Sequence, residues 1–433
     1  MSTAVERPVF LGAPGRAPGA PGLGAHAPAN PSAFTFWALL VFFVLEYVRP
    51  PGIVQLRLQM VFILLVPVLW LRLSQRPWSR NLTLQFAMLV HAAVSILYAS
   101  NYFTAYVRTR SLFGTFAVAL AITWVLSERR AFERAVWFWV AIMCYQALYS
   151  LQAGGHGSGG FIGDENDLAL ACATVFPFVY AGVLYSKRRI LCLLLAALYA
   201  GAIVVSFSRG GFLGLVAGTL FCVMVGKHRI RNISIGLIAA SIFYLALPAS
   251  YKVELETIQD TDSGTSESRR FLWSAATNMW RDHPILGVGA GNSPWLIGRY
   301  QPRVAQGKLF QSGSYQERNW TGTVVHSLYF ELLAESGLVG CALYAAIVYG
   351  HFMGLRRLRR NLGRDPRASR ELRGRVDLYT TALGGGAFAY LVAGAFLSVL
   401  YYPYLWYFSA LAVALDRWVR AELEAPGSAP ATS

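Results

Sequence analysis

The chain has 433 residues, a formal net charge of +16, 55% hydrophobic residues and only 14% charged residues. A soluble domain usually carries about a quarter charged residues, whereas here long apolar blocks alternate with short basic clusters, which indicates a membrane protein. Because the basic clusters are divided among loops rather than gathered into one groove, nucleic-acid binding is disfavoured. The positive charge fits a topology signal and attraction to anionic membrane lipid.

The first 32 residues contain eleven Gly and Pro and almost no large apolar residue. They do not resemble a signal peptide, because no apolar run follows a basic start. We predict a disordered cytoplasmic tail at 1–32 and a second cytoplasmic tail at 421–433. The five cysteines all fall inside apolar blocks, where we expect small packing residues rather than a disulfide or metal framework.

Twelve apolar blocks come close to the roughly 20 helical residues that cross a hydrocarbon core of about 30 Å. They predict an all-α polytopic membrane protein with about twelve transmembrane helices, nine within 33–248 and three within 327–420, separated by a large loop at 249–326. The predicted spans lie near 34–48, 53–71, 82–98, 111–126, 132–151, 168–185, 190–206, 211–226, 232–248, 327–355, 378–398 and 403–419.

The distribution of Lys and Arg predicts the orientation. With a cytoplasmic N-terminus, 25 of the 38 Lys and Arg residues lie in cytoplasmic segments and only five in short outward connections. The remaining eight lie in the large loop, which is too long for the rule to count. Both termini are therefore predicted to face the cytoplasm and the large loop to face the periplasm, in a bacterial inner membrane.

Few spans carry an ionisable residue near the middle, which weakens a transporter interpretation. His91 does, and a lone histidine there is more often a hydrogen-bonded packing residue than a relay. Glu331 and Glu335 lie in the first turns of the tenth span. The segment 287–292 looks like a phosphate loop but lacks the Lys-Ser/Thr ending, so we expect a glycine-rich turn after Pro284.

Two outward turns carry polar residues. Gly163-Asp164-Glu165-Asn166-Asp167 precedes an apolar helix and is either an N-cap, with acidic residues that suit the helix dipole, or a polar contact to a sugar or lipid head group.

Arg209 lies in Ser206–Gly211, where glycines permit close approach to a ligand. Its guanidinium could bind a phosphate bidentately; the alternative is a snorkelling interfacial arginine.

The large loop contains a predicted helix from Ser266 to about Asp282, stopped by His283-Pro284. Its first turns hold Arg269 and Arg270, which are either ligand-binding residues or an exposed basic pair. Apolar residues follow at helical spacing, as in a helix that lies on the membrane surface: Leu272, Trp273, Ala276, Met279 and Trp280.

His326-Ser327 stands at the start of span ten. If the helix begins there, at about 100° per residue, Gly337 lies about 20° and Gly340 about 40° from His326. The three would then share one face, and small residues permit close helix packing in lipid. A lone histidine is more often structural, but a rigidly seated outward histidine facing two arginines is a candidate general base.

Together these segments resemble the O-antigen ligase and polymerase superfamily. The most specific part is His326-Ser327, then nine residues, then Gly337-Leu338-Val339-Gly340. The resemblance covers about residues 150–345 in motifs and the whole chain in topology. It also rests on Ser208-Arg209-Gly210-Gly211, on Gly163–Ala169, and on Arg269 four residues before Trp273, followed by Pro284–Gly289.

The resemblance implies a membrane glycosyltransferase fold of the GT-C type. It also implies transfer of a glycan from an undecaprenyl-pyrophosphate donor to an acceptor hydroxyl at the periplasmic face, inverting and without metal or cofactor. Arg209 and Arg269 would bind the donor pyrophosphate and stabilise the leaving group, with Arg270 as the alternative if the register slips by one. His326 would deprotonate or orient the acceptor hydroxyl. Asp260-Thr261-Asp262 matches a metal-binding pattern by letter, but a flexible acidic turn is expected.

Three activities share these motifs: ligation of O-antigen to a sugar hydroxyl of the lipid A core, polymerisation of the repeat, and transfer to protein Ser or Thr. The single large loop at 249–326 favours the ligase, by analogy. The expected partners are the lipid-linked glycan donor, the lipid A-core acceptor and membrane lipid. A lipid-linked sugar transporter, which would carry charged residues along a midplane cavity, and an inactive scaffold are the alternatives from other classes.

Overall fold

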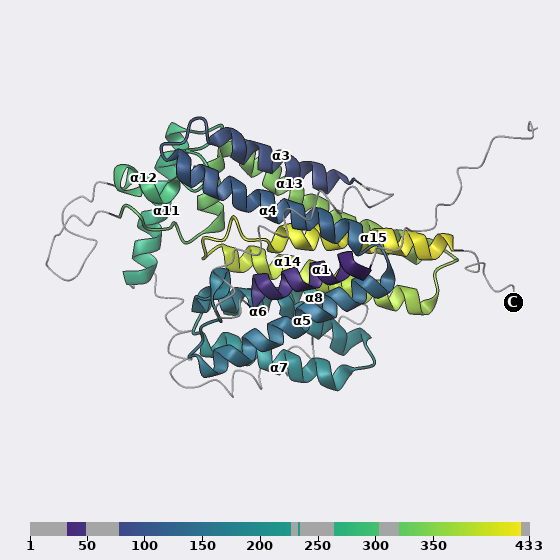
Figure 1. Cartoon of the computed structure of the whole chain (residues 1–433). Coiled ribbons are helices and arrows are strands. Elements are labelled where there is room, and N and C mark those ends of the chain that lie inside the picture. Colours follow the sequence, from purple (N-terminus) through teal and green to yellow (C-terminus); the bar gives the residue numbers. More distant parts are fainter. Residues whose placement is uncertain (1–32, 49–77, 227–232, 234–263, 303–319, 426–433) are drawn as a thin grey trace, which may run out of the picture.

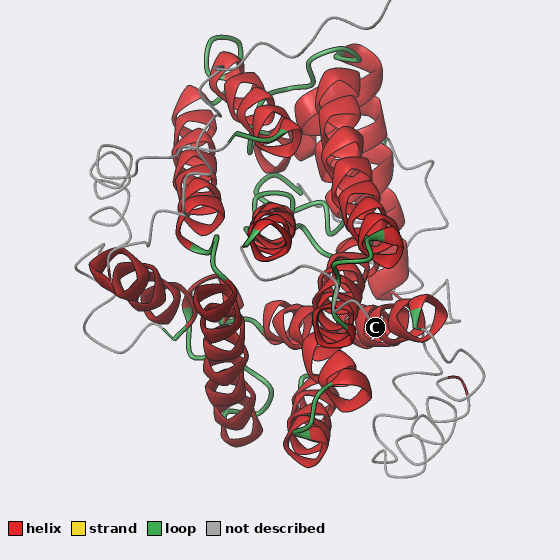
Figure 2. Ribbon diagram, turned by 90° about the vertical axis from the view of Figure 1, so that its right-hand side faces the viewer, coloured by secondary structure: helices red, strands yellow, loops and turns green. Residues whose placement is uncertain are grey.

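The computed structural model describes residues 33–48, 78–226, 233, 264–302 and 320–425. Across these ranges it contains helices and loops and no strand, as Figure 2 shows. The predicted tail at 1–32, the predicted span at 53–71 and the Asp260-Thr261-Asp262 turn lie outside the described residues. So do the predicted span at 232–248, except for residue 233, and the predicted tail at 421–433, except for residues 421–425.

Ten of the twelve predicted spans fall on described residues, and each corresponds to a helix. The helices are α1 (Ala33–Tyr47), α3 (Arg80–Ser95), α4 (Tyr102–Val125), α5 (Arg129–Gln152), α6 (Glu165–Tyr185), α7 (Arg189–Val205), α8 (Arg209–Val225), α13 (Leu328–Arg364), α14 (Arg370–Gly394) and α15 (Tyr404–Glu424). Several extend past the predicted span into polar sequence, as where α13 continues to Arg364 rather than 355. An apolar block ends at the first charges, whereas a helix continues for as long as its backbone bonds and one packed face persist.

Two of the described helices, α6 and α13, are long and apolar enough to cross a membrane, and α1, α7 and α8 are shorter apolar helices. The helix α14 packs along α6 and α8 in the middle of the bundle (Figure 1). The contact between α6 and α8 is close, since a Cβ atom on Gly211 would lie 2.3 Å from the Cβ of Ala169. Small residues at such crossings let helices approach closely, and here they fix the start of α8 beside the start of α6.

Two further helices, α11 (Gly264–Asp282) and α12 (Ser293–Tyr300), cover one end of the bundle, at the left of Figure 1. The helix α11 ends at Asp282 as predicted and begins two residues before Ser266. Several of the apolar residues predicted to face a membrane surface are instead covered by α12 and the start of α13. Trp273 stacks on Phe330 with ring centroids 5.0 Å apart, and a buried cluster joins Leu272, Ala275, Ala276, Met279, Ile297, Val325 and Ala334.

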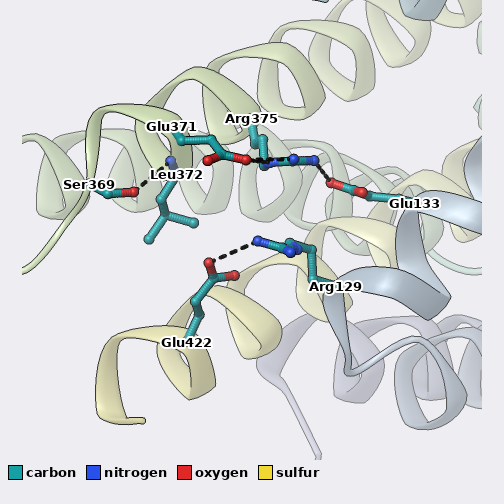
Figure 3. Close-up of polar contacts among 7 residues, drawn as sticks. All are labelled: Arg129, Glu133, Ser369, Glu371, Leu372, Arg375 and Glu422. Atoms are coloured by element: carbon teal, nitrogen blue, oxygen red, sulfur yellow. Dashed lines mark hydrogen bonds and ion pairs between the residues drawn. The ribbon is translucent and has the colours of Figure 1, made fainter. Parts of the chain in front are cut away.

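The opposite end of the bundle is joined by ion pairs between α5, α14 and α15 (Figure 3). Arg129 of α5 lies 3.2 Å from Glu422 of α15. Arg375 of α14 lies 2.5 Å from Glu133 of α5 and 2.7 Å from Glu371, one turn earlier on its own helix. Each of these two arginines therefore has at least one carboxylate partner. They lie at the end of the bundle that the distribution of Lys and Arg predicts to be cytoplasmic.

Candidate functional site

Arg209 is the first residue of α8, and the turn before it is held in place by its neighbours. Ser208 caps the helix by accepting a hydrogen bond from Gly211 N at 3.2 Å. The same hydroxyl donates to Asn166 Oδ1 at 2.8 Å. The Arg209 backbone is therefore anchored to the first turn of α6, while the side chain is half-buried.

The acidic segment before α6 takes the N-cap role that was one of its two predicted alternatives. Asp164 caps α6, and its Oδ1 accepts a hydrogen bond from Asn166 N at 2.9 Å. Asp167 accepts one from the Tyr402 hydroxyl at 2.8 Å. Tyr402 belongs to the connection between α14 and α15 (residues 395–403), so this connection lies beside the first turn of α6.

His326 precedes α13 rather than forming part of it. Its φ is +54°, an uncommon value for a residue other than glycine, and Ser327 is the N-cap of the helix. The backbone N–H of His326 donates to Ser398 Oγ at 2.8 Å. The side chain is half-buried, and its place is set by the connection between α14 and α15.

The predicted helical face shared by His326, Gly337 and Gly340 is wrong. His326 has no helical backbone, and α13 is interrupted at Gly337, where φ is +57° and ψ is −160°. An angular register cannot be carried through such a break, because the rotation of about 100° per residue holds only for continuous helix. The spacing of these residues has a different structural basis.

The break in α13 is closed by the glycine-rich turn that follows α11. Residues on both sides of Gly337 exchange backbone hydrogen bonds with this turn, so the helix recovers partners that the break removes. The bonds run from Leu338 N to Pro284 O (2.9 Å), from Val339 N to Ile285 O (3.1 Å), from Val288 N to Ala334 O (2.9 Å) and from Gly289 N to Glu335 O (3.0 Å). The predicted glycine-rich turn after Pro284 is confirmed, and its role is to pair with α13.

Only glycine fits where the two backbones meet. A Cβ on Gly337 would lie 2.5 Å from Ile285 O, and one on Gly287 would lie 2.4 Å from the carbonyl carbon of Glu335. His91 of α3 completes the junction, with Nε2 3.1 Å from the carbonyl oxygen of Ser336. This contact agrees with the prediction of a hydrogen-bonded packing histidine.

Arg269, Arg209 and His326 influence one another electrostatically. Burial and, next, the positive charge of Arg209 lower the pKa of the Arg269 guanidinium. Burial and then the charge of Arg269 lower the pKa of His326, whereas the carboxylate of Asp164 acts in the opposite direction. The structure thus brings together three of the predicted site residues from α8, α11 and the segment before α13, with Asp164 beside them.

Arg270 differs from its neighbour in its surroundings. Arg269 is half-buried and Arg270 is exposed. The charge of Arg270 is not among the causes that shift the pKa of His326 or Arg269. Arg269 is therefore the arginine of α11 that meets the other predicted site residues.

Two buried glutamates of α13 support this region, and sequence reasoning gave them no role. Glu335 is 1% exposed and Glu331 is 8% exposed. Glu331 accepts a hydrogen bond from Leu400 N at 3.3 Å. Glu335 accepts four, from Gly291 N, from Ser293 N and Oγ, and from the Tyr401 hydroxyl. Two carboxylates four residues apart at the start of an apolar span were the sequence signal.

This arrangement is suited to chemistry on an anionic substrate. Arg209 and Arg269 carry like charges and repel each other, which favours the binding of an anion by both. Guanidinium groups bind phosphate oxygens well. A histidine whose pKa is lowered is neutral near pH 7 and is able to accept a proton. The site thus combines anion binding with a base.

Residues 191–345 match the model of a protein family described as O-antigen ligase. No curated protein matches the chain. The matched range contains Arg209, Arg269, His326 and the break in α13 at Gly337, while the cap of α6 lies before it. The resemblance predicted from the motifs is confirmed, and the domain indicates a glycan-transfer enzyme of the ligase or polymerase type. Residues 191–345 therefore carry a domain of the O-antigen ligase type, in a chain whose described residues form helices and loops.

Proposed function

We propose that the protein is an O-antigen ligase of the bacterial inner membrane. It transfers a glycan from an undecaprenyl-pyrophosphate donor to a sugar hydroxyl of the lipid A core, at the periplasmic face of a GT-C-type fold, with both termini in the cytoplasm. The observation that carries the proposal is the meeting of Arg209, Arg269 and His326 from three separate elements within the range that matches the family.

The two arginines bind the donor. Arg209 and Arg269 are close enough for the charge of Arg209 to lower the pKa of Arg269, so an anion bound by both offsets part of their repulsion. A pyrophosphate is such an anion. In the transition state, negative charge grows on the departing pyrophosphate oxygen, and fixed guanidinium groups stabilise it without reorganisation. Because the leaving group is already good, charge stabilisation and positioning suffice without a metal.

His326 acts on the acceptor. Its lowered pKa keeps the imidazole neutral near pH 7, so it accepts the proton of the attacking hydroxyl. The acceptor oxygen forms a bond to the anomeric carbon, and the bond from that carbon to the pyrophosphate oxygen breaks with inversion. The electron pair leaves with undecaprenyl pyrophosphate. Asp164, whose charge favours the protonated imidazole, stabilises the imidazolium that forms.

The banding pattern of lipopolysaccharide from a deletion strain tests this assignment. We expect the strain to lose its O-antigen ladder and accumulate lipid-linked polymer, and we expect the wild-type gene to restore the ladder. The variants Arg209→Ala, Arg269→Ala and His326→Ala should fail to restore it, while Arg270→Ala, the neighbouring exposed arginine, should retain most of it.

Other patterns point to other functions. A single-repeat product in the deletion strain identifies a polymerase, and an intact ladder with lost protein glycosylation identifies a protein oligosaccharyltransferase. If His326→Ala leaves glycan attachment intact while donor translocation fails, the protein is a transporter. Full complementation by all three alanine variants would mean that the chain is a scaffold.

A further inference from the structure

The carboxylate of Glu335 joins α13 to two other segments that lie far from each other in the sequence. Its Oε2 accepts hydrogen bonds from Gly291 N at 2.6 Å and from the Tyr401 hydroxyl at 2.5 Å. Its Oε1 accepts from Ser293 N at 3.1 Å and from Ser293 Oγ at 2.7 Å. A nearly fully buried carboxylate with four donors is held in one geometry.

The first of these segments leads to Arg269. Gly291 lies in the turn that follows α11, and Ser293 begins α12 directly after it. The backbone bonds across the break in α13 hold the same turn through residues 284–289. Since α11 carries Arg269 and ends at Asp282, the position of this turn fixes the end of α11 against α13. The apolar cluster between α11 and α13 fixes the rest of that helix.

The second segment leads to His326. Tyr401 belongs to the connection between α14 and α15, and the same connection supplies Ser398, whose hydroxyl accepts the backbone N–H of His326. Glu331 binds this connection through Leu400 N, and within the described part of the chain no hydrogen bond joins its carboxylate to the turn after α11. Glu335 is thus the carboxylate that contacts both the element leading to Arg269 and the one leading to His326.

We propose that Glu335 is a positioning residue that sets the separation between Arg269 and His326, although it touches neither. The inference rests on the proposed glycan transfer for its consequence in catalysis. An ionised carboxylate is an acceptor at both oxygens, so it satisfies all four donors. A glutamine would place an NH₂ group against the Gly291 N–H, which also donates to the Tyr401 hydroxyl at 3.1 Å, or against the Ser293 N–H. Two N–H donors would then face each other, which disturbs the geometry of the contact. Misplacement of reacting groups by about 1 Å can cost about 100-fold in rate.

The kinetic test compares variants of the full-length protein in lipid nanodiscs, with the lipid-linked glycan donor and the lipid A-core acceptor. We expect Glu335→Gln to lower kcat about 100-fold while the KM values change less than about threefold. Tyr401→Phe removes one of the four donors and should lower kcat about tenfold. Combining the two should do little more than Glu335→Gln alone, because both act through one contact.

Glu331→Gln is the matched control, one turn earlier on the same helix and also buried. It should lower kcat less than Glu335→Gln does. If Glu335 were merely structural, Glu335→Gln would reduce the amount of folded protein but leave the kcat of the folded fraction unchanged. That outcome, or an equal loss in the Glu331→Gln variant, overturns the proposal.

A distance measurement separates this inference from the proposed function. Spin labels at Ser274→Cys on α11 and Tyr349→Cys on α13, both exposed positions, report the separation of the two helices once the native cysteines are replaced. Glu335→Gln should broaden the distance distribution, and Glu331→Gln should leave it like that of the wild type. An unchanged distribution in Glu335→Gln overturns the inference. If the distance distribution broadens in Glu335→Gln but the wild-type protein transfers no glycan, the proposed function is refuted and the coupling through Glu335 is supported.

Discussion

The two ends of the helical bundle use their arginines differently. At one end, Arg375 lies between Glu133 and Glu371, and Arg129 meets Glu422 (Figure 3). At the other end, the charge of Arg209 lowers the pKa of Arg269, and the charge of Arg269 lowers the pKa of His326. At the first end Arg129 and Arg375 have carboxylate partners, whereas at the second end Arg209 and Arg269 are near enough to repel each other, with Asp164 beside them.

We interpret this difference as one between arginines that hold helices together and arginines that bind a substrate. Partly exposed ion pairs such as those of Arg375 contribute only about 1 kcal/mol or less each, and they link helices without needing a ligand. Groups of like charge held together, with pKa values shifted by burial and by one another, are typical of sites that bind or transform a substrate. Substitutions at the two ends should therefore affect different measurements.

The largest effect is expected at His326. The variant His326→Ala should lower kcat for glycan transfer about 1,000-fold, because a positioned general base contributes about 10²–10⁴-fold. His156→Ala is the matched control, since His156 is an exposed histidine that lies 3.3 Å from Glu165. It should keep near wild-type activity. If His326→Ala retains more than a tenth of the wild-type kcat, the base assignment is wrong.

Arginine substitutions compare the two ends directly. Arg269→Ala and Arg209→Ala should each lower kcat about 100-fold, the usual cost of removing one charge-stabilising donor. Arg375→Ala, at the paired end, should leave kcat unchanged and lower the thermal unfolding temperature slightly. Equal losses of activity at both ends would show that the charge distribution does not mark the site.

The break in α13 gives a test within one helix. Gly337→Ala should destabilise the protein by about 1–3 kcal/mol, because an L side chain is strained at φ +57° and its Cβ would lie 2.5 Å from Ile285 O. Thermal unfolding in detergent would measure the loss. Gly354→Ala, towards the other end of α13, meets open space and should be neutral or slightly stabilising. Equal stability of the two variants would contradict the observed break.

The smallest expected effect is a displacement of the pH profile. Burial and Arg269 disfavour the imidazolium of His326, so activity should fall only as the pH drops below the ordinary histidine pKa of about 6.5. Arg269→Gln removes a positive charge, raises the pKa of His326 and should move this acidic limb to higher pH. Asp164→Asn removes the charge that favours the imidazolium and should move it to lower pH. The dependence of residual kcat on pH measures both shifts, and displacement in the opposite directions would exclude His326 as the titrating group.

Much of the fold was predictable from the sequence. Apolar blocks bounded by basic clusters located all ten described spans, because hydrophobicity and backbone hydrogen bonding leave a buried segment few alternatives to a helix. The paired arginine end was not predicted, since Glu133, Glu371 and Glu422 come from three helices whose mutual packing the sequence does not state.

The residues of the candidate site could be proposed from motifs, whereas their arrangement could not. Arg209, Arg269 and His326 stand in these motifs, and the sequence also distinguishes Arg269 from Arg270. Arg269 is three residues before Leu272, so it shares a helical face with the apolar residues that are buried. The break at Gly337 and the role of Glu335 depend on a turn that lies about fifty residues earlier in the sequence, and no local pattern reveals such a partner.

The pairing across Gly337 has a consequence for how the protein is assembled. The peptide groups of α13 at the break find their partners in the turn of residues 284–289 and, for the carbonyl of Ser336, in His91 of α3. Before that turn docks, an interrupted helix would leave those groups unsatisfied in an apolar environment, which is costly. We therefore expect α13 to insert into the bilayer as a continuous helix and to become interrupted at Gly337 afterwards. The candidate site would then form only after this turn has docked on α13.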